Sequence, residues 1–218
     1  MHRLLFSKTG NAVWISHLDL MRVFQRSFRR AGLMLKHSQG FSPRAIVSIA
    51  LPLSVGVDSR CELLDFELTG EPVADDEIKT RLNEALPQGV RVEEVYESAR
   101  KLRELTHLQV RLALEYDKGV PEGAQEAIAA LFRRESLTVE KKSKKGITSV
   151  DILPMVQKLK VTGQPDGLNL DAVICAQNPS LNPSLLAEAI AVYLPEIAPD
   201  FVKISRLEAL DGQGEAFR

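Results

Sequence analysis

The sequence predicts an α+β protein in which the same order of elements occurs twice, and three observations support that prediction. Strands are marked by alternation of apolar and polar residues, most clearly at 60–70, where Leu64, Phe66 and Leu68 share one face. Segments with helical periodicity separate the strands. The pattern strand, helix, two strands, helix, strand then repeats in the second half of the chain. We therefore expect two tandem ferredoxin-like (βαββαβ) domains, at 1–100 and 101–210.

The first expected domain begins with a strand and a basic helix. Ser16 can cap that helix, Asp19 follows at the spacing of a capping box, and Gly32 stands where a glycine often ends a helix. The expected elements are a strand at 2–8, the helix from Ser16, strands at 44–53 and 60–70, a helix at 73–87 and a strand at 90–98.

The second expected domain follows a charged boundary at 97–104, which lacks a clear apolar pattern. Pro121 favours the first turn of its first helix. The residues 211–218, DGQGEAFR, are expected to form a flexible tail. The expected elements are a strand at 106–116, a helix at 121–135, one or two strands around a basic turn in 137–163, a strand at 168–176, a helix at 182–194 and a strand at 200–210.

The composition of the 218 residues is that of a globular protein, with 44% hydrophobic and 26% charged residues. No apolar stretch is long enough to span a bilayer, so we expect no membrane partner. The first ten residues, MHRLLFSKTG, lack the apolar region and the cleavage site of a secretion signal. These features favour a cytoplasmic protein.

The two cysteines, Cys61 and Cys175, lie far apart in the sequence. We expect both to be free thiols, because a reducing cytosol disfavours a disulfide. No Cys or His at metal-finger spacing accompanies either one, so we expect no metal site and no cofactor. Two cysteines also cannot supply the three thiolates of a radical enzyme's iron–sulfur cluster. The chain is therefore not expected to be a radical enzyme by itself.

Positive charge is concentrated at the N-terminal end of a chain whose net charge is only −1. Residues 1–46 contain eight Lys or Arg and a single acid, Asp19, which gives +7. The remaining residues contain 20 Lys or Arg and 28 acids, which gives −8. An asymmetry of this size indicates an anionic partner for the basic end.

Four arginines share one side of the helix in WISHLDLMRVFQRSFRRAG, residues 14–32. At 100° per residue, five apolar residues form the opposite side. Like charges at this spacing destabilise a helix slightly, and arginine suits bidentate phosphate contacts. Three interpretations remain open: a solvated face paired with acids elsewhere in the fold, a phosphate-binding face, or a docking surface for an acidic protein. The arginines are Arg22, Arg26, Arg29 and Arg30, and the apolar residues are Leu20, Met21, Phe24, Phe28 and Ala31.

Other residues extend the candidate surface for an anion or RNA. Lys144 and Lys145 lie at the tip of a predicted hairpin, whose alternative role is a solvated loop. Aromatic side chains that could stack on bases are scarce near the basic region, where Trp14 and Phe41 are the only obvious candidates, and this scarcity disfavours sequence-specific binding of single strands. The full candidate set for anion or RNA binding is Lys8, Arg22, Arg26, Arg29, Arg30, Arg44, Lys144 and Lys145.

His17 is the candidate for a catalytic residue, because a base beside Ser16 and Asp19 could transfer a proton. No second titrating group at fixed spacing supports that role, and a histidine packed near the helix cap is the alternative. Glu62 and Asp65 are three residues apart on a predicted strand, so they face opposite sides and do not form a carboxylate pair.

Several ordered blocks resemble the radical SAM-linked protein family, a bacterial domain family of unknown function. These blocks are FSKTG, SHLDLMRVFQRSFRRAGL, SQGFSPR, SIALPLSVGVDSRCELLDFEL and, in the second half, KKGITSVDILPMVQKL. The resemblance implies a separate radical SAM enzyme as partner, because members are fused to such proteins or encoded beside them. It carries over no catalytic residue. The positions that match the family's signature are Lys8, Gly10, His17, Asp19, Arg22, Arg29, Arg30, Gly40, Phe41, Pro43, Gly56, Glu62 and Asp65.

Three functions are consistent with the sequence. The leading hypothesis is a non-catalytic accessory module that presents RNA, or another anionic substrate, to a separate radical SAM enzyme. The second is a protein-docking domain for that enzyme. The third is a metal-independent ribonuclease, which rests on architectural analogy alone and requires an exposed His17.

Overall fold

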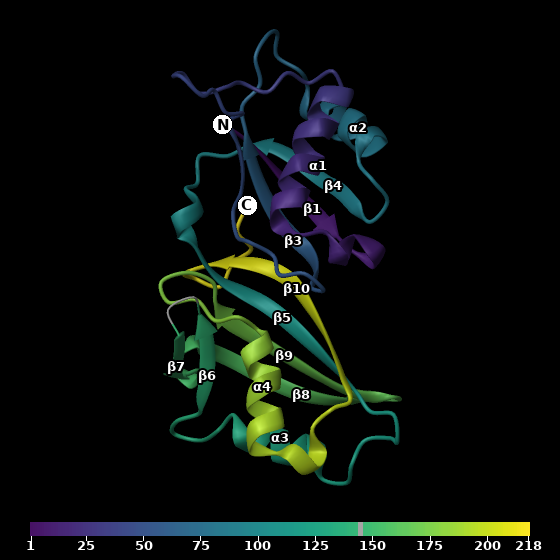
Figure 1. The fold of residues 1–218 in the computed structure, drawn as a ribbon, viewed down its shortest axis with the longest axis vertical. Helices are drawn as coiled ribbons and strands as arrows, with labels where there is room; N and C mark the ends of the chain where they lie inside the picture. Colours follow the sequence, from purple (N-terminus) through teal and green to yellow (C-terminus); the bar gives the residue numbers. More distant parts are fainter. Residues whose placement is uncertain (144–145) are drawn as a thin grey trace. The chain divides into compact units, whose positions relative to one another are not determined.

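The computed structural model describes residues 1–143 and 146–218. These residues divide into two units, one formed by 1–104 with Arg218 and the other by 105–217. Both units combine antiparallel strands with two α-helices (Figure 1), which agrees with the predicted α+β class. None of the helices described is long and apolar enough to cross a membrane.

The first unit has the strand order β4-β1-β3, with the short strand β2 paired to β3, and every pairing is antiparallel. Helices α1 and α2 contribute to the same hydrophobic core, so both cover one face of this sheet. The elements are β1 (His2–Lys8), α1 (His17–Arg30), β2 (Val47–Ile49), β3 (Asp58–Phe66), α2 (Asp75–Ala85) and β4 (Val90–Glu97).

Aromatic rings fix α1 on this sheet. The ring of Phe24 meets that of Phe6 on β1 edge to face, with centroids 4.8 Å apart. One turn further along, the ring of Phe28 lies 4.9 Å from that of Phe66 on β3. All four side chains are fully buried. This apolar stripe leaves the opposite side of α1 toward solvent.

Both predicted ends of α1 are confirmed. The Ser16 hydroxyl accepts a hydrogen bond from the backbone N–H of Asp19 at 3.2 Å. At the other end Gly32 has a φ of +69°. The N–H of Leu33 then donates to the carbonyl of Phe28 at 2.9 Å, as in a glycine-terminated helix.

The second unit has the strand order β10-β5-β9-β8, again antiparallel, and β6 and β7 form a separate two-stranded hairpin. The chain therefore has three strands where the sequence predicted one or two in 137–163. The elements are β5 (Leu105–Glu115), α3 (Ala124–Leu131), β6 (Thr138–Ser143), β7 (Gly146–Asp151), β8 (Val156–Gln164), β9 (Gly167–Cys175), α4 (Ser184–Tyr193) and β10 (Phe201–Asp211).

Three expectations about element limits are wrong. The strand expected at 44–53 is reduced to β2, Val47–Ile49: the N–H of Ile46 pairs with the carbonyl of Lys36 instead, and Pro52 has no N–H for a ladder that reaches residue 53. The helix expected from 121 begins at Ala124, whose N–H donates to the carbonyl of Pro121. The tail expected to be flexible is folded: Phe217 is fully buried and its N–H donates to the carbonyl of Ala209 at 2.7 Å.

Gly89 allows a close backbone approach that the sequence did not reveal. Its carbonyl accepts from the N–H of Thr9 at 2.7 Å, in the turn that precedes β4. A Cβ at this position would lie 2.5 Å from the Thr9 carbonyl oxygen and 2.9 Å from the Ala12 Cβ. The backbone also has a φ of +88°, which disfavours any residue with a side chain.

We therefore expect Gly89→Ala to destabilise the first unit by more than Gly70→Ala. Gly70 has a similar φ of +94° but open space around its Cβ position, so it isolates the conformational cost of roughly 1–2 kcal/mol. Steric overlap should add about 1–3 kcal/mol at Gly89. Urea unfolding, followed by circular dichroism and by the fluorescence of Trp14, measures both. Equal losses of stability in the two variants would contradict the prediction, because they would show that the structure removes the steric overlap at Gly89 at no cost.

Candidate functional site

The arginine face, defined as Arg22, Arg26, Arg29 and Arg30, lies on the side of α1 away from the core. All four residues are exposed, whereas Leu20, Phe24 and Phe28 are buried. The predicted division of the helix is therefore correct for these residues, but the four arginines differ in what they contact.

Arg22 is partly neutralised by Asp19. Its guanidinium donates to Asp19 Oδ1 at 2.7 Å, while the Ser16 hydroxyl donates to Oδ2 at 2.7 Å. The hydrogen bond from Ser16, followed by that from Arg22, lowers the pKa of the Asp19 carboxyl below its usual value. The single acid of the basic segment is thus committed to the first turn of the helix and to its nearest arginine.

Arg30 has a structural partner. Its Nη2 donates to the carbonyl of Ala85 at 2.6 Å and to the Ser27 hydroxyl at 2.9 Å. Ala85 is the last residue of α2, so the guanidinium lies at the negative end of that helix. This contact explains Arg30 without a ligand.

Arg26 and Arg29 have neither an acidic nor a carbonyl partner among residues 1–143 and 146–218. Because residues three and four apart are neighbours on a helix, Arg22, Arg26 and Arg29 form one continuous ridge. Arg29 also lines a small pocket of about 130 Å³ at the end of this ridge, together with Gln25 and His37. The two unpartnered arginines are therefore the part of the face available to an anion.

The segment that follows α1 contributes further exposed groups. Phe41 is fully exposed and follows Gly40, whose φ is +130°. Arg44 is exposed, and its backbone N–H donates to the Ser38 hydroxyl. The ammonium of Lys36, in contrast, pairs with Glu67 at 2.7 Å. Trp14, before the helix, is also 69% exposed.

Lys8 does not belong to this surface, which corrects the expectation for that residue. Its side chain is fully buried and its Nζ donates to the carbonyl of Val13 at 3.1 Å. Lys8 lies opposite Ser59 in the β1–β3 register, and the Ser59 hydroxyl donates to Glu62 at 2.8 Å. Lys8, Ser59 and Glu62 are therefore parts of a buried polar region, out of reach of a polyanion.

His17 is partly buried at the first residue of α1. Its Nδ1 is buried and has no hydrogen-bond partner within the part of the chain that the structure describes. No carboxylate is therefore hydrogen-bonded to this nitrogen in the described residues. Lys144 and Lys145, the other predicted basic group, lie outside the described residues.

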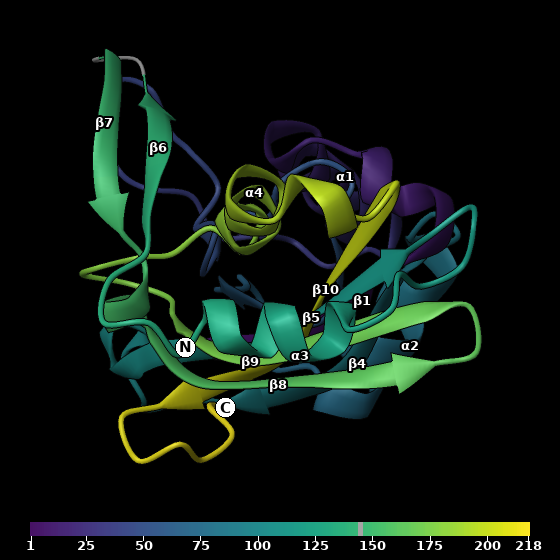
Figure 2. The ribbon, with the colours of Figure 1, turned by 90° about the horizontal axis from the view of Figure 1, so that it is seen from below.

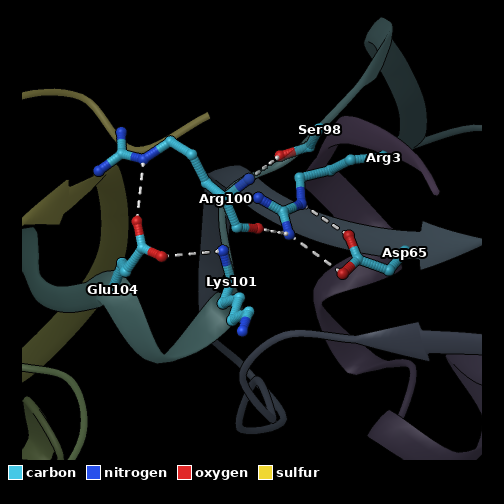
Figure 3. Close-up of polar contacts among 6 residues, drawn as sticks. All are labelled: Arg3, Asp65, Ser98, Arg100, Lys101 and Glu104. Atoms are coloured by element: carbon cyan, nitrogen blue, oxygen red, sulfur yellow. Dashed lines mark hydrogen bonds and ion pairs between the residues drawn. The ribbon is translucent and has the colours of Figure 1, made fainter.

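Asp65 takes part in a buried ion pair that the sequence did not predict. The Arg3 guanidinium donates to both carboxylate oxygens, at 2.6 and 3.1 Å, and Nη2 also donates to the carbonyl of Arg100 at 3.0 Å (Figure 3). Arg3 is 2% and Asp65 8% exposed. The pair thus ties β1 and β3 to the segment that follows β4. Glu62 and Asp65 face opposite sides of β3, as predicted, and Glu62 accepts from the Ser59 hydroxyl instead.

The same segment borders a cavity of about 360 Å³ beside the ion pair, lined also by Met1, Ser98 and Lys101. Its walls are held by local bonds: the Arg100 N–H donates to the Ser98 hydroxyl, and the Lys101 N–H to Glu104 (Figure 3). Because successive residues of a strand face opposite sides, Arg3 lies on the face away from Leu4 and Phe6, which pack in the core with the helices. Only the fold shows that its partner lies 62 residues away.

The remaining signature residues serve the backbone in this structure. Gly10, Gly40 and Gly56 all have positive φ angles, which glycine adopts without strain. Cys61 is buried and Cys175 partly buried, and both are thiols that form no disulfide, as predicted. The described residues contain no cluster of His, Cys, Asp and Glu that could hold a metal ion.

Comparison with protein-family models matches residues 2–183 to an uncharacterised protein family conserved in bacteria (DUF2344). The chain belongs to this family. A search of curated proteins finds no match. The matched residues include the arginine face, the Arg3–Asp65 pair and strand β8.

Among solved structures, one similar chain comes from a crystal structure of a Cbf5-Nop10-Gar1 complex. Its TM-score is 0.51 at 9% identity, over 95% of this chain and 48% of that one. This chain therefore spans about half the length of that protein, and the likeness concerns the fold alone. An unknown protein from Galdieria sulphuraria is similar at a TM-score of 0.27 and 14% identity, over 94% and 95% of the two chains.

We expect Asp65→Ala to destabilise the first unit by about 3–5 kcal/mol, because it leaves the buried Arg3 guanidinium without its carboxylate. The double variant Arg3→Met/Asp65→Leu should recover most of that loss, since it removes both charges. Glu77→Ala breaks the exposed pair with Arg81 and serves as control, with an expected cost under about 1 kcal/mol. Urea unfolding measures all three. A cost at Asp65 no larger than at Glu77 would contradict the prediction.

Proposed function

We propose that this chain is a non-catalytic accessory module that binds single-stranded RNA through Arg26 and Arg29. The observation that carries the proposal is that both guanidinium groups are exposed and unpartnered in the described residues, on one ridge of a helix whose orientation is fixed by its buried side. Their planar donors suit bidentate contacts with phosphate oxygens.

Electrostatics favours a polyanion over an internal partner for this ridge. The only acid in residues 1–46 is Asp19, and its carboxylate is already engaged by Ser16 and Arg22. Like-charged neighbours on a helix each cost a few tenths of a kcal/mol. A phosphate backbone would relieve this repulsion and release its counterions on binding, which is the main source of affinity for nucleic acids.

Exposed aromatic rings favour single strands over duplexes. Phe41 is fully exposed, and its loop also supplies His37 and Ala45 to the pocket that Arg29 lines. Trp14 provides a second exposed ring before α1. Unpaired bases can stack on such side chains, whereas the bases of a duplex cannot reach them.

The partner that would act on this RNA is proposed to be a separate radical SAM enzyme. Support comes from the ordered sequence blocks that resemble radical SAM-linked proteins, and from the two cysteines, too few for the cluster of such an enzyme. A ribonuclease activity has less support, because the buried Nδ1 of His17 has no hydrogen-bond partner in the described residues. We also interpret both units as ferredoxin-like, with support from the strand orders β4-β1-β3-β2 and β10-β5-β9-β8.

We expect the chain to bind single-stranded RNA with an affinity that falls steeply with salt, and Arg26→Glu/Arg29→Glu to abolish most of it. Fluorescence anisotropy with a labelled mixed-sequence RNA across a salt series measures the effect. Each phosphate that the variant no longer neutralises should reduce the steepness of the logarithmic salt dependence by about 0.7. Circular dichroism checks the fold of the variant.

The matched control is Arg91→Glu/Arg103→Glu, which makes the same change of charge at exposed positions outside α1. It should leave most of the affinity in place. Equal losses in both double variants would mean that only net charge matters. Absence of RNA binding at low salt would overturn the proposal and favour the second candidate, an acidic protein surface as the partner of this ridge.

A further inference from the structure

A cleft of about 560 Å³ runs between α3 and β8 in the second unit. Gln125, Ala129 and Phe132 line it from the helix side, and Leu159 and Val161 from the strand. Figure 2 shows α3 running alongside β8 and β9, with β8 on the outside. At Gly163 the strand comes so close to the helix that a Cβ would lie 3.4 Å from the Gln125 side-chain oxygen. The cleft therefore follows a sheet edge.

β8 is an edge strand of nine residues. In the described part of the chain it pairs only with β9, and no other backbone hydrogen bond reaches residues 157–164. In an antiparallel ladder, alternate residues of such a strand direct their N–H and C=O groups outward. These groups form a template on which an extended peptide can add a further strand.

The register separates the two faces of this edge. Leu159 lies opposite Ala172, and Val161 opposite Leu170, both of which are buried in the core beneath the helices. The alternate residues, Lys158 and Lys160, therefore point to the other face. Both lysines are exposed and have no ion-pair partner among the described residues.

The acid opposite Lys160 on the neighbouring strand already has a partner. Lys160 lies opposite Asp171 on β9, but both carboxylate oxygens of Asp171 accept from Arg111, at 2.7 and 3.1 Å. The cleft itself is also basic: Arg133 and Arg134 line it against the single carboxylate of Glu126. The edge thus presents open backbone groups in a field that attracts negative charge.

We propose that β8 binds an acidic peptide segment in extended conformation, which adds to the sheet edge as a fifth strand beside the order β10-β5-β9-β8. Side chains of such a strand alternate between the faces. One set would pack against Leu159, Val161 and Phe132 in the cleft, and the other would meet Lys158 and Lys160. The matching segment therefore alternates apolar and acidic residues.

The charges also distinguish this partner from a second copy of the chain. Two β8 strands side by side would bring their lysines together, and lysine on an edge strand is a common means of preventing such pairing. The repulsion is removed when the incoming strand carries carboxylates. The same residues thus disfavour self-association and favour an acidic strand.

A labelled nine-residue peptide of alternating Glu and Val, the length of β8, tests the proposal by fluorescence anisotropy with the full chain. The companion probe is the same peptide with N-methyl groups on alternate amides, which keeps its charge but removes backbone donors. Two probes, methylated in opposite phase, cover both pairing registers. We expect one of them to bind about tenfold more weakly than the unmodified peptide.

Lys158→Glu/Lys160→Glu should weaken binding of the unmodified peptide by a further factor of about ten or more, because it reverses the charge of the edge. Lys118→Glu/Lys203→Glu, with the same charge change at other exposed sites of this unit, should leave it nearly unchanged. Three results would overturn the proposal. The methylated peptides could bind as tightly as the unmodified peptide, or a peptide of alternating Lys and Val could bind more tightly than the Glu-Val peptide. The bound Glu-Val peptide could also be displaced by RNA but not by unlabelled Glu-Val peptide. Concentration-dependent self-association that blocks the peptide would overturn the proposal as well.

Discussion

The packing of one aromatic stripe on one sheet determines what the first unit can present to a partner. Phe24 and Phe28 meet Phe6 and Phe66 from two strands, and all four rings are fully buried. Burial of each ring contributes on the order of 1.5–3 kcal/mol, far more than the few tenths that separate orientations of exposed charges. The rotation of α1 is therefore set by its apolar side, and its arginines face solvent as a consequence.

Local signals in the sequence predict the ends of α1 correctly, whereas the long-range contacts of the first unit are not predictable from the sequence. Ser16 and Gly32 mark the limits of α1 through bonds to residues within one turn, so the sequence alone predicts them. The partner of Arg3, in contrast, lies 62 residues away and depends on the pairing of β1 with β3. The expectation that Lys8 lies on the surface assumed that one face of β1 is in contact with solvent. The strand is instead buried along nearly its whole length. A strand covered on both faces shows no alternation that would reveal it.

The edge at β8 combines two features that are separately common. Exposed edge strands usually carry charged side chains that prevent pairing with another strand, and binding clefts are usually lined by apolar residues. Here the register directs Leu159 and Val161 to the helix side and Lys158 and Lys160 to the opposite side. Because Arg111 occupies Asp171, the lysines are not neutralised by the neighbouring strand. These features are the basis of the proposed selectivity of this edge for an acidic strand.

Within the arginine face, Arg26 and Arg29 are the residues whose charge the fold does not explain. Arg22 pairs with the carboxylate of Asp19, and Arg30 donates to the carbonyl of Ala85 at the end of α2. The positive charge of each is therefore explained by a contact within the fold. Arg26 and Arg29 have no such contact in the described residues, and their mutual repulsion opposes the helix slightly. A neutral polar residue would serve the fold at least as well at both positions. Their presence is therefore best explained by something outside the chain, and a negatively charged partner is the one that this ridge would bind.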